Sequence, residues 1–189
     1  SRKDCLKFKI DSVVNVLYPE AKTLILNDIP RGAPCTILMA SDYIEKNNKL
    51  LILNADQYFN CDLNKKIDLI NNSFDLGVLY FEAIHPRWSY ILFEDDKRTI
   101  VRSEEKKPIS KNAIAGFYYF KNFDIFFNSA CKSIENEDEL EGIIYTSSLI
   151  NQAILLGYKA GGIKVKNSDY YSFYSISRFK EFEKYVNKL

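Results

Sequence analysis

The chain of 189 residues has the length of one domain and can bury a substantial core. Hydrophobic residues make up 47% and charged residues 27%, a balance typical of globular proteins that argues against disorder. The formal net charge of +1, with basic residues scattered among acidic ones, argues against nucleic acid as a partner. Because no apolar run is long enough to span a membrane and no secretory signal is visible, we expect a cytoplasmic protein without membrane contact.

The residues that build zinc sites or histidine-dependent active sites are scarce. The four cysteines are widely spaced without a Cys-x-x-Cys pair, and His85 is the sole histidine. Buried, reduced thiols are typical of such spacing and agree with a reducing compartment. We therefore expect neither a zinc centre nor catalysis through a histidine-activated nucleophile.

Strand and helix patterns alternate through the first half of the chain. Short apolar runs predict strands, and apolar residues at helical spacing predict helices. In chain order, the expected elements are strand 23–26, helix 35–44, strand 50–53, helix 63–70 and strand 75–82. This alternation implies crossover connections, and therefore an α/β domain with a mixed, mostly parallel sheet and helices on both faces.

The second half contains aromatic strands, then helices. The expected elements are strands 89–94 and 99–102 joined by a turn at 95–98, strand 115–120, helices 123–134 and 147–156, strand 160–165 and a terminal helix 177–189. Since neither an internal repeat nor a linker rich in Gly, Pro or Ser divides the chain, we predict a single domain over 1–189.

The most informative stretch is Leu-Ile-Leu-Asn-Ala-Asp at 51–56. The apolar run predicts a buried strand, so Asp56 would lie at the carboxyl edge of the sheet, where ligands of open α/β sheets bind. A carboxylate there can hold Mg²⁺, an ion that keeps waters and binds substrate phosphates. The alternative is that Asn54 and Asp56 only cap a turn after the strand.

Three further positions have the composition of ligand-binding segments. Gly32 precedes an expected helix, where a glycine permits close approach of a ligand and free amides attract anions; a simple turn into the helix is the alternative. In the charged run 104–107, Lys106 could bind phosphate, although such runs are usually solvated surface. Gly116 would leave room for a ligand against its strand.

Five segments occur together in an order that is typical of one enzyme family. They are the loop at Gly32, Leu-Ile-Leu-Asn-Ala-Asp at 51–56, His-Pro-Arg-Trp-Ser-Tyr at 85–90, Glu-Lys-Lys-Pro-Ile-Ser at 105–110 and Ala-Gly-Phe-Tyr-Tyr-Phe at 115–120. With these segments, the chain resembles the sugar-phosphate nucleotidyltransferases of bacterial surface-polysaccharide synthesis from about residue 20 to about residue 125. The resemblance implies a Rossmann-like fold and transfer of a nucleotidyl group from an NTP to a phosphorylated sugar or alcohol, with release of pyrophosphate, for capsule or another surface polysaccharide.

The resemblance also implies a role for each matching residue. Asp56 matches the Mg²⁺ ligand, and Asp169 is a candidate second metal ligand. The nucleotide side would be formed by Gly32, Ala33 and Asn54. On the acceptor side, the sugar-phosphate motif is matched by Glu105 and Lys106, the substrate-side glycine by Gly116, and Trp88 is a candidate to stack on substrate. Because the substrate phosphate itself attacks the α-phosphorus, the metal and Lys106 need only offset the negative charge, and no protein nucleophile is required.

The sequence departs from the family at both ends. The family begins with a strand and a Gly-rich signature loop that holds the triphosphate, and no such segment occurs here. We therefore expect a fragment of a longer domain, without the N-terminal strand. Near the other end, residues 169–179 do not match the Gly-Thr-Pro-Glu-Asp segment of many members. Two alternatives stay open: a GT-A glycosyltransferase with 54–56 as its metal motif, and a non-catalytic domain that lost the signature loop.

Overall fold

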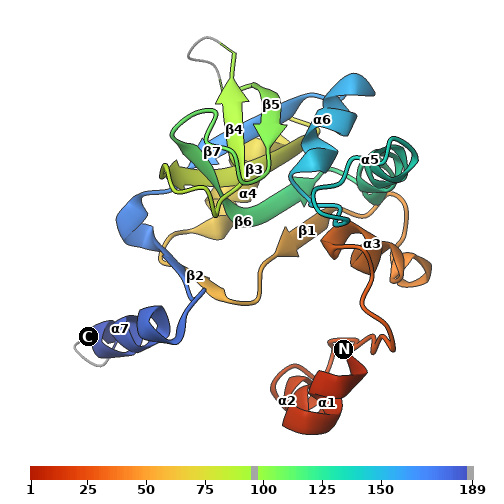
Figure 1. Ribbon diagram of the computed structural model, residues 1–189, viewed down its shortest axis with the longest axis vertical. Coiled ribbons are helices and arrows are strands. Elements are labelled where there is room, and N and C mark those ends of the chain that lie inside the picture. Colours follow the sequence, from red (N-terminus) through yellow and green to blue (C-terminus); the bar gives the residue numbers. More distant parts are fainter. Residues whose placement is uncertain (95–97, 187–189) are drawn as a thin grey trace.

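A six-stranded sheet forms the centre of the computed structural model, which describes residues 1–94 and 98–186 (Figure 1). The helices are α1 (Arg2–Phe8), α2 (Ile10–Leu17), α3 (Ala33–Leu38), α4 (Leu63–Asn71), α5 (Phe123–Glu135), α6 (Ser148–Leu155) and α7 (Ile176–Val186), with short 3-10 turns at Ser41–Tyr43 and Asn167–Asp169. The strands are β1 (Leu50–Leu53), β2 (Gln57–Phe59), β3 (Leu76–Glu82), β4 (Tyr90–Phe93), β5 (Ile100–Glu104), β6 (Asn112–Phe120), β7 (Ala160–Lys164) and β8 (Tyr170–Ser172).

The strands of the large sheet follow the order β5-β4-β6-β3-β7, and β1 also pairs with β6. Along one edge of β6, β1 lies opposite Phe117 to Phe120 and β4 begins opposite Ala113. The carboxyl end of β1 and the amino end of β4 therefore meet beside the middle of β6. A separate two-stranded ladder of β2 and β8 follows β1 and leads to α7.

Strand β6 is buried along nearly its whole length and separates two cores. Ile114, Tyr118 and Phe120 face one core, whereas Phe117 and Tyr119 face the other. This alternation follows from the two-residue period of a strand, and because both faces are covered, the sequence of β6 is almost continuously apolar.

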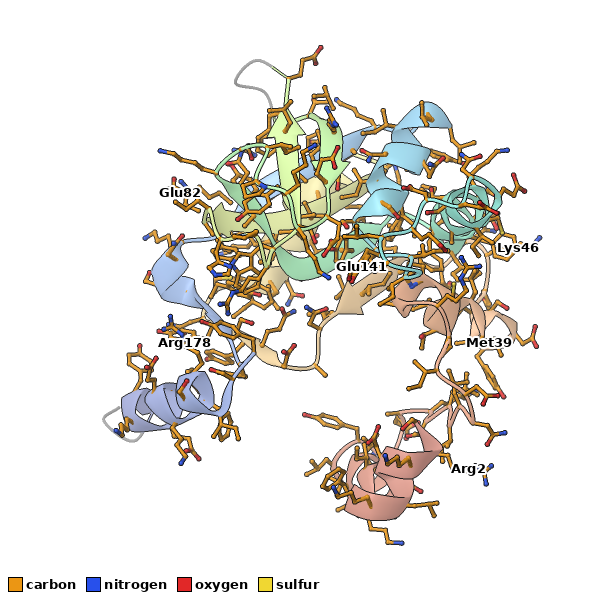
Figure 2. All side chains as sticks on the ribbon, viewed as in Figure 1. Arg2, Met39, Lys46, Glu82, Glu141 and Arg178 are labelled. Atoms are coloured by element: carbon orange, nitrogen blue, oxygen red, sulfur yellow. The ribbon has the colours of Figure 1, made fainter. Side chains whose placement is uncertain are left out.

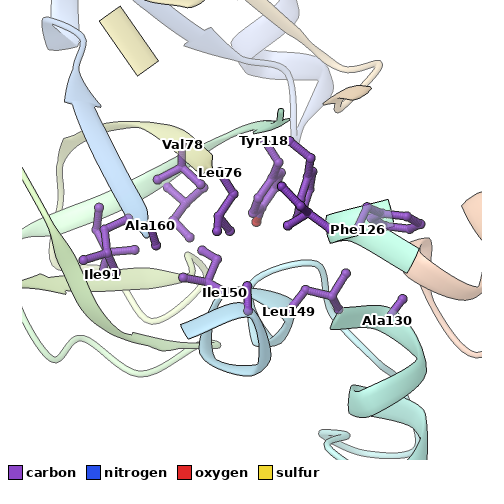
Figure 3. Close-up of a cluster of buried hydrophobic side chains, with 14 of the residues drawn as sticks. Leu76, Val78, Ile91, Tyr118, Phe126, Ala130, Leu149, Ile150 and Ala160 are labelled. Atoms are coloured by element: carbon purple, nitrogen blue, oxygen red, sulfur yellow. The ribbon is translucent and has the colours of Figure 1, made fainter. Parts of the chain in front are cut away.

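Helices cover both faces of the sheet, as the sequence predicts. On one face, Phe126 and Ala130 of α5 and Leu149 and Ile150 of α6 pack against β3, β4 and β6 (Figure 3). On the other face, Ile70 of α4 packs with residues of β3 and β6. Helices α4 and α5 each begin at a capping side chain: Asp62 accepts from the backbone N–H of Lys65, and Asn122 accepts from that of Ile125.

The α/β class and the mixed sheet are confirmed, but the balance of directions differs from the expectation. Among the described strands of the large sheet, β3 and β7 form the parallel pair, and the other paired strands run antiparallel. The reason is that the hairpin of β4 and β5 and the long β6 return directly along their neighbours, without a helical crossover between them.

The predicted strand 23–26 is wrong: this segment is irregular in the structure, and it has an exposed backbone path between α2 and α3. No described strand pairs with it, so its backbone has no neighbouring strand with which to form ladder hydrogen bonds.

The predicted helix 35–44 is shorter and starts earlier, at Ala33, because Pro34 suits the first turn of a helix. The hairpin strands are confirmed, and most of their predicted turn, 95–97, lies outside the described residues.

Helices α1 and α2 lie apart from the sheet at one end of the molecule (Figure 1). Neither contains a buried residue, and the backbone N–H of Arg2 donates to the carbonyl of Leu26 in the segment that follows them. Within residues 1–94 and 98–186, no helix combines the length and the apolar character needed to span a bilayer.

Candidate active site

A cavity with a volume of about 340 Å³ opens where β1 ends and β4 begins along β6. Five of the residues singled out from the sequence, one from each of the five segments described above, line it: Ala33, Asn54, Trp88, Glu105 and Gly116. The structure thus brings together residues that are up to 83 positions apart in the sequence, counted from Ala33 to Gly116. We refer to this space as the β6 cavity.

Gly116 fixes the wall of the β6 cavity through its backbone. It adopts φ +58°, a conformation that favours glycine, and its carbonyl accepts from the backbone N–H of Asn54 at 3.1 Å and from Nε2 of Gln57 at 2.9 Å. A Cβ atom here would lie 2.5 Å from Nδ2 of Asn54 and 2.7 Å from Oε1 of Gln57. The prediction that Gly116 leaves room for a ligand is therefore wrong at this point, because the amide side chains of Asn54 and Gln57 fill the space beside it.

Glu105 presents a carboxylate to the cavity that two hydroxyl groups hold in place. Oγ of Ser89 donates to Oε2 of Glu105 at 2.5 Å, and Oγ of Ser147 donates to the same oxygen at 2.7 Å. Ser89 precedes β4 and Ser147 precedes α6, so the carboxylate ties the sheet to a helix. The phenol of Tyr118 lies nearby, and burial, together with the charge of Glu105, raises the pKa of Tyr118.

Lys106 lies beside the cavity and contacts one of its lining residues. Nζ of Lys106 donates to the hydroxyl of Tyr145 at 3.0 Å and lies 4.0 Å from Oε2 of Glu141, which is labelled in Figure 2. The hydrogen bond to Tyr145 is the main cause that raises the pKa of Lys106, so its ammonium stays charged at neutral pH. Lys106 itself adopts φ +53°, a strained conformation for a residue with a side chain, and such residues are concentrated at functional sites.

Gly32 starts α3 and has a structural role that the sequence did not reveal. It adopts φ +114°, and a Cβ atom would lie 2.0 Å from the carbonyl oxygen of Ile144. The backbone N–H of Ile144 in turn donates to the carbonyl of Arg31 at 2.8 Å. Gly32 thus permits the close approach of two backbone segments, and this contact places Ala33 at the cavity wall.

Asp56 and Asp169 are not brought together. The backbone N–H of Phe173 donates to the carbonyl of Asp56, whereas that of Asn60 donates to the carbonyl of Asp169, so the two acids mark opposite ends of the β2–β8 ladder. Four residues of strand correspond to about 13 Å, too far for both carboxylates to bind one ion. The prediction of Asp169 as partner of Asp56 is therefore wrong in this arrangement, because the β2–β8 register opposes Asp169 to Asn60 instead.

Asp56 remains the exposed carboxylate nearest to the end of β1. Ser172 and Phe173, which offer no carboxylate, are its neighbours across the ladder. Across the described part of the chain, no group of three or more His, Cys, Asp or Glu side chains is arranged to hold a metal ion. A metal at Asp56 would accordingly need most of its ligands from water and substrate.

Several polar residues of the site were not foreseen from the sequence. Gln57, Ser89, Tyr145 and Ser147 hold Gly116, Glu105 and Lys106 in place. Of these four, Ser89 lies in the segment 85–90 but was assigned no role, and the others stand outside the five segments. Gln57 follows Asp56 directly, and its position after an expected strand was the one available signal. The strand is confirmed as β1, but the expectation that it is buried is wrong, because Leu51 and Leu53 keep 39% and 43% of their surface exposed.

No family model and no curated protein matches the chain, but solved structures share its fold. A nucleoside-diphosphate-sugar pyrophosphorylase from Vibrio cholerae RC9 superposes with a TM-score of 0.77 at 15% identity, covering 96% of this chain and 76% of that one. A Bacillus anthracis protein described as a glucose-1-phosphate thymidylyltransferase, in complex with sucrose, gives 0.71 at 18% identity, with 95% and 73% covered.

A third neighbour of the same fold is the inositol-1-phosphate CTP transferase from T. maritima, with a TM-score of 0.68 at 15% identity, covering 92% of this chain and 69% of that one. The chain therefore has the Rossmann-like fold of nucleotide-diphospho-sugar pyrophosphorylases and nucleotidyltransferases. At these identities the likeness defines the fold, and activity has to be argued from the β6 cavity.

Proposed function

We propose that this chain, as a single domain over 1–189, acts in nucleotidyl transfer from an NTP to a phosphorylated sugar or alcohol, with release of pyrophosphate. The main support is the β6 cavity, which gathers Asn54, Trp88, Glu105 and Gly116 from segments where the sequence resembles such enzymes. Solved proteins of this fold that are named for these reactions add to the support. We extend the proposal to surface-polysaccharide synthesis and to the cytoplasm, where NTPs are available.

In the proposed reaction, a phosphate oxygen of the acceptor attacks the α-phosphorus of the NTP, and the bond from that phosphorus to pyrophosphate breaks. Lys106 places a positive charge beside Tyr145, where it can bind the acceptor phosphate. The carboxylate of Glu105, held by Ser89 and Ser147, can accept hydrogen bonds from acceptor hydroxyls. Trp88 offers an apolar surface for the acceptor ring.

Another part of the lining of the β6 cavity is assigned to the nucleotide. Ala33, at the start of α3, and Asn54, which follows β1, both line the cavity, and Gly32 fixes the position of Ala33. Mg²⁺, when bound, would neutralise and orient the phosphates. The exposed carboxylate of Asp56 fits an ion that keeps several waters and takes its other ligands from phosphates.

Replacement of Lys106 tests this proposal most directly. In Lys106→Ala, we expect the KM for the phosphorylated acceptor to rise about tenfold while the KM for the NTP changes little, because a charged contact to phosphate is lost. Pyrophosphate release from each NTP with a panel of sugar 1-phosphates provides the rates, and calorimetry provides acceptor affinities. Lys107→Ala is the matched control, since Lys107 is also an exposed lysine of the same run.

Three results would contradict the proposal. The first is that sugar phosphates bind no more tightly than the free sugars. The second is that Lys106→Ala raises the KM for the acceptor and the KM for the NTP by the same factor. The third is release of a free nucleoside diphosphate from a nucleotide sugar, which would favour the glycosyltransferase alternative. If neither reaction and no binding occurs, the non-catalytic alternative is favoured.

A further inference from the structure

A second and larger cavity, with a volume of about 460 Å³, lies between the loop before β4 and the segment from β8 to α7. Arg87 and Trp88 line both this space and the β6 cavity, whereas Arg178 and Phe182 line only the second space. Arg178, at the start of α7, is labelled in Figure 2. We call this space the aromatic cavity because most of its walls are aromatic side chains.

Two arginine side chains in the aromatic cavity gather around one phenol ring. The guanidinium of Arg87 lies 4.1 Å from the ring centroid of Tyr174, and Nε of Arg178 donates to the hydroxyl of Tyr174 at 3.1 Å. Arg178 also pairs with Glu181 at 3.1 Å. Within residues 1–94 and 98–186, no carboxylate lies within ion-pair distance of Arg87, whose Nε instead donates to Nδ1 of His85 at 3.2 Å. The two arginines thus outnumber the one acidic partner, which favours an anionic ligand.

The remaining walls provide flat apolar surfaces next to these charges. Trp88 packs edge-on against Phe81 with ring centroids 5.2 Å apart, and Phe81 lies 4.8 Å from Tyr170. Rings held by such contacts form a rigid wall against which a planar or sugar ring can pack at little entropic cost. The volume lies in the range of ordinary small-molecule sites, roughly 300–1,000 Å³.

We propose that the aromatic cavity binds a phosphorylated ring compound, with its phosphate between Arg87 and Arg178 and its ring against Trp88 and Phe81. Planar guanidinium groups bind phosphate through paired N–H donors, which explains the use of arginine at both positions. A nucleoside monophosphate and a sugar phosphate share this chemistry. The site adjoins the β6 cavity through Arg87 and Trp88, and the proposal does not depend on the proposed nucleotidyl transfer.

The fluorescence of Trp88 provides the test, because it is the sole tryptophan of the chain. The probes are cytidine 5′-monophosphate, glucose 1-phosphate, inorganic phosphate, cytidine and glucose, each titrated into the full chain with excitation beyond nucleotide absorption. We expect saturable changes with at least one of the two phosphorylated ring compounds. In Arg178→Gln, the affinity should fall about tenfold or more, because a charged hydrogen bond to phosphate is lost.

Two variants decide which cavity the signal reports. Lys180→Gln removes a positive charge from the same helix without touching the aromatic cavity, and it should bind as the unchanged chain does. In Lys106→Ala, beside the β6 cavity, the part of the response that depends on Arg178 should persist. Loss of the signal in Lys106→Ala with no loss in Arg178→Gln would assign the ligand to the β6 cavity and overturn the proposal.

The probes separate the remaining outcomes. Equal affinity for cytidine and its monophosphate, or for glucose and its phosphate, would overturn the role of the arginines. Equal affinity for inorganic phosphate would overturn the role of the aromatic wall. Absence of any response up to millimolar concentrations, confirmed by calorimetry, would overturn the site as a whole.

Discussion

Strand β6 and helix α2 both have largely apolar sequences but opposite surroundings. In β6, every residue from Ala113 to Phe120 is buried, whereas α1 and α2 contain no buried residue, and Val16 keeps 78% of its surface exposed. The difference lies in the neighbours: β6 has paired strands on both edges and helices over both faces, while α1 and α2 lie apart from the sheet. An apolar pattern thus defines a face that can be buried, but the face is buried only where other strands or helices pack against it.

Substitution in β6 should give the largest effect on stability. Phe120 is fully buried, and its ring lies 5.5 Å from that of Phe126 in an edge-to-face contact. Phe120→Ala should lower the free energy of unfolding by about 3–5 kcal/mol, because it removes a buried ring and leaves a cavity. Urea denaturation followed by circular dichroism measures this change. Phe120→Leu, which keeps most of the apolar volume, should cost clearly less, and a loss below about 1 kcal/mol in the alanine variant would contradict the burial of β6.

The same comparison explains which parts of the fold could be predicted from the sequence. The continuous apolar run of β6 and the helical spacing of apolar residues are local signals, so most strands and helices from residue 50 onward were foreseen. The strand at 23–26 was not realised because its formation depends on a neighbouring strand, which a local pattern does not contain.

The candidate site divides in the same way. Gly116 and Glu105 were found because they stand in recognisable segments, and the structure places both at the β6 cavity. Ser89 and Ser147 were missed, since they meet Glu105 only after β4 and α6 have packed together. Asp169 was placed wrongly because the register of a two-stranded ladder cannot be derived from either strand alone.

A helix cap next to β6 should give an intermediate effect. Oδ1 of Asn122 accepts from the backbone N–H of Ile125 at 3.0 Å at the start of α5. Asn122→Ala should destabilise the protein by about 1 kcal/mol, because an amide at the first turn loses its partner. Asn128→Ala is the matched control, since Asn128 is an exposed residue inside the same helix. Equal midpoints of urea unfolding for the two variants would remove Asn122 as a stabilising cap.

The smallest effect on the free energy of unfolding is expected in α2, and this measurement also tests whether the exposed face of α2 is free in solution. Val16→Ala should change the free energy of unfolding by less than about 0.5 kcal/mol, because the side chain is mostly exposed and alanine favours helix. The identical substitution at Val78 of β3, which keeps only 1% of its surface exposed, should cost about 2 kcal/mol. Urea denaturation of both variants, at several protein concentrations, measures the difference. If Val16→Ala costs as much as Val78→Ala, the apolar face of α2 is buried in solution, and a dependence of that cost on protein concentration would identify a second copy of the chain as what covers it.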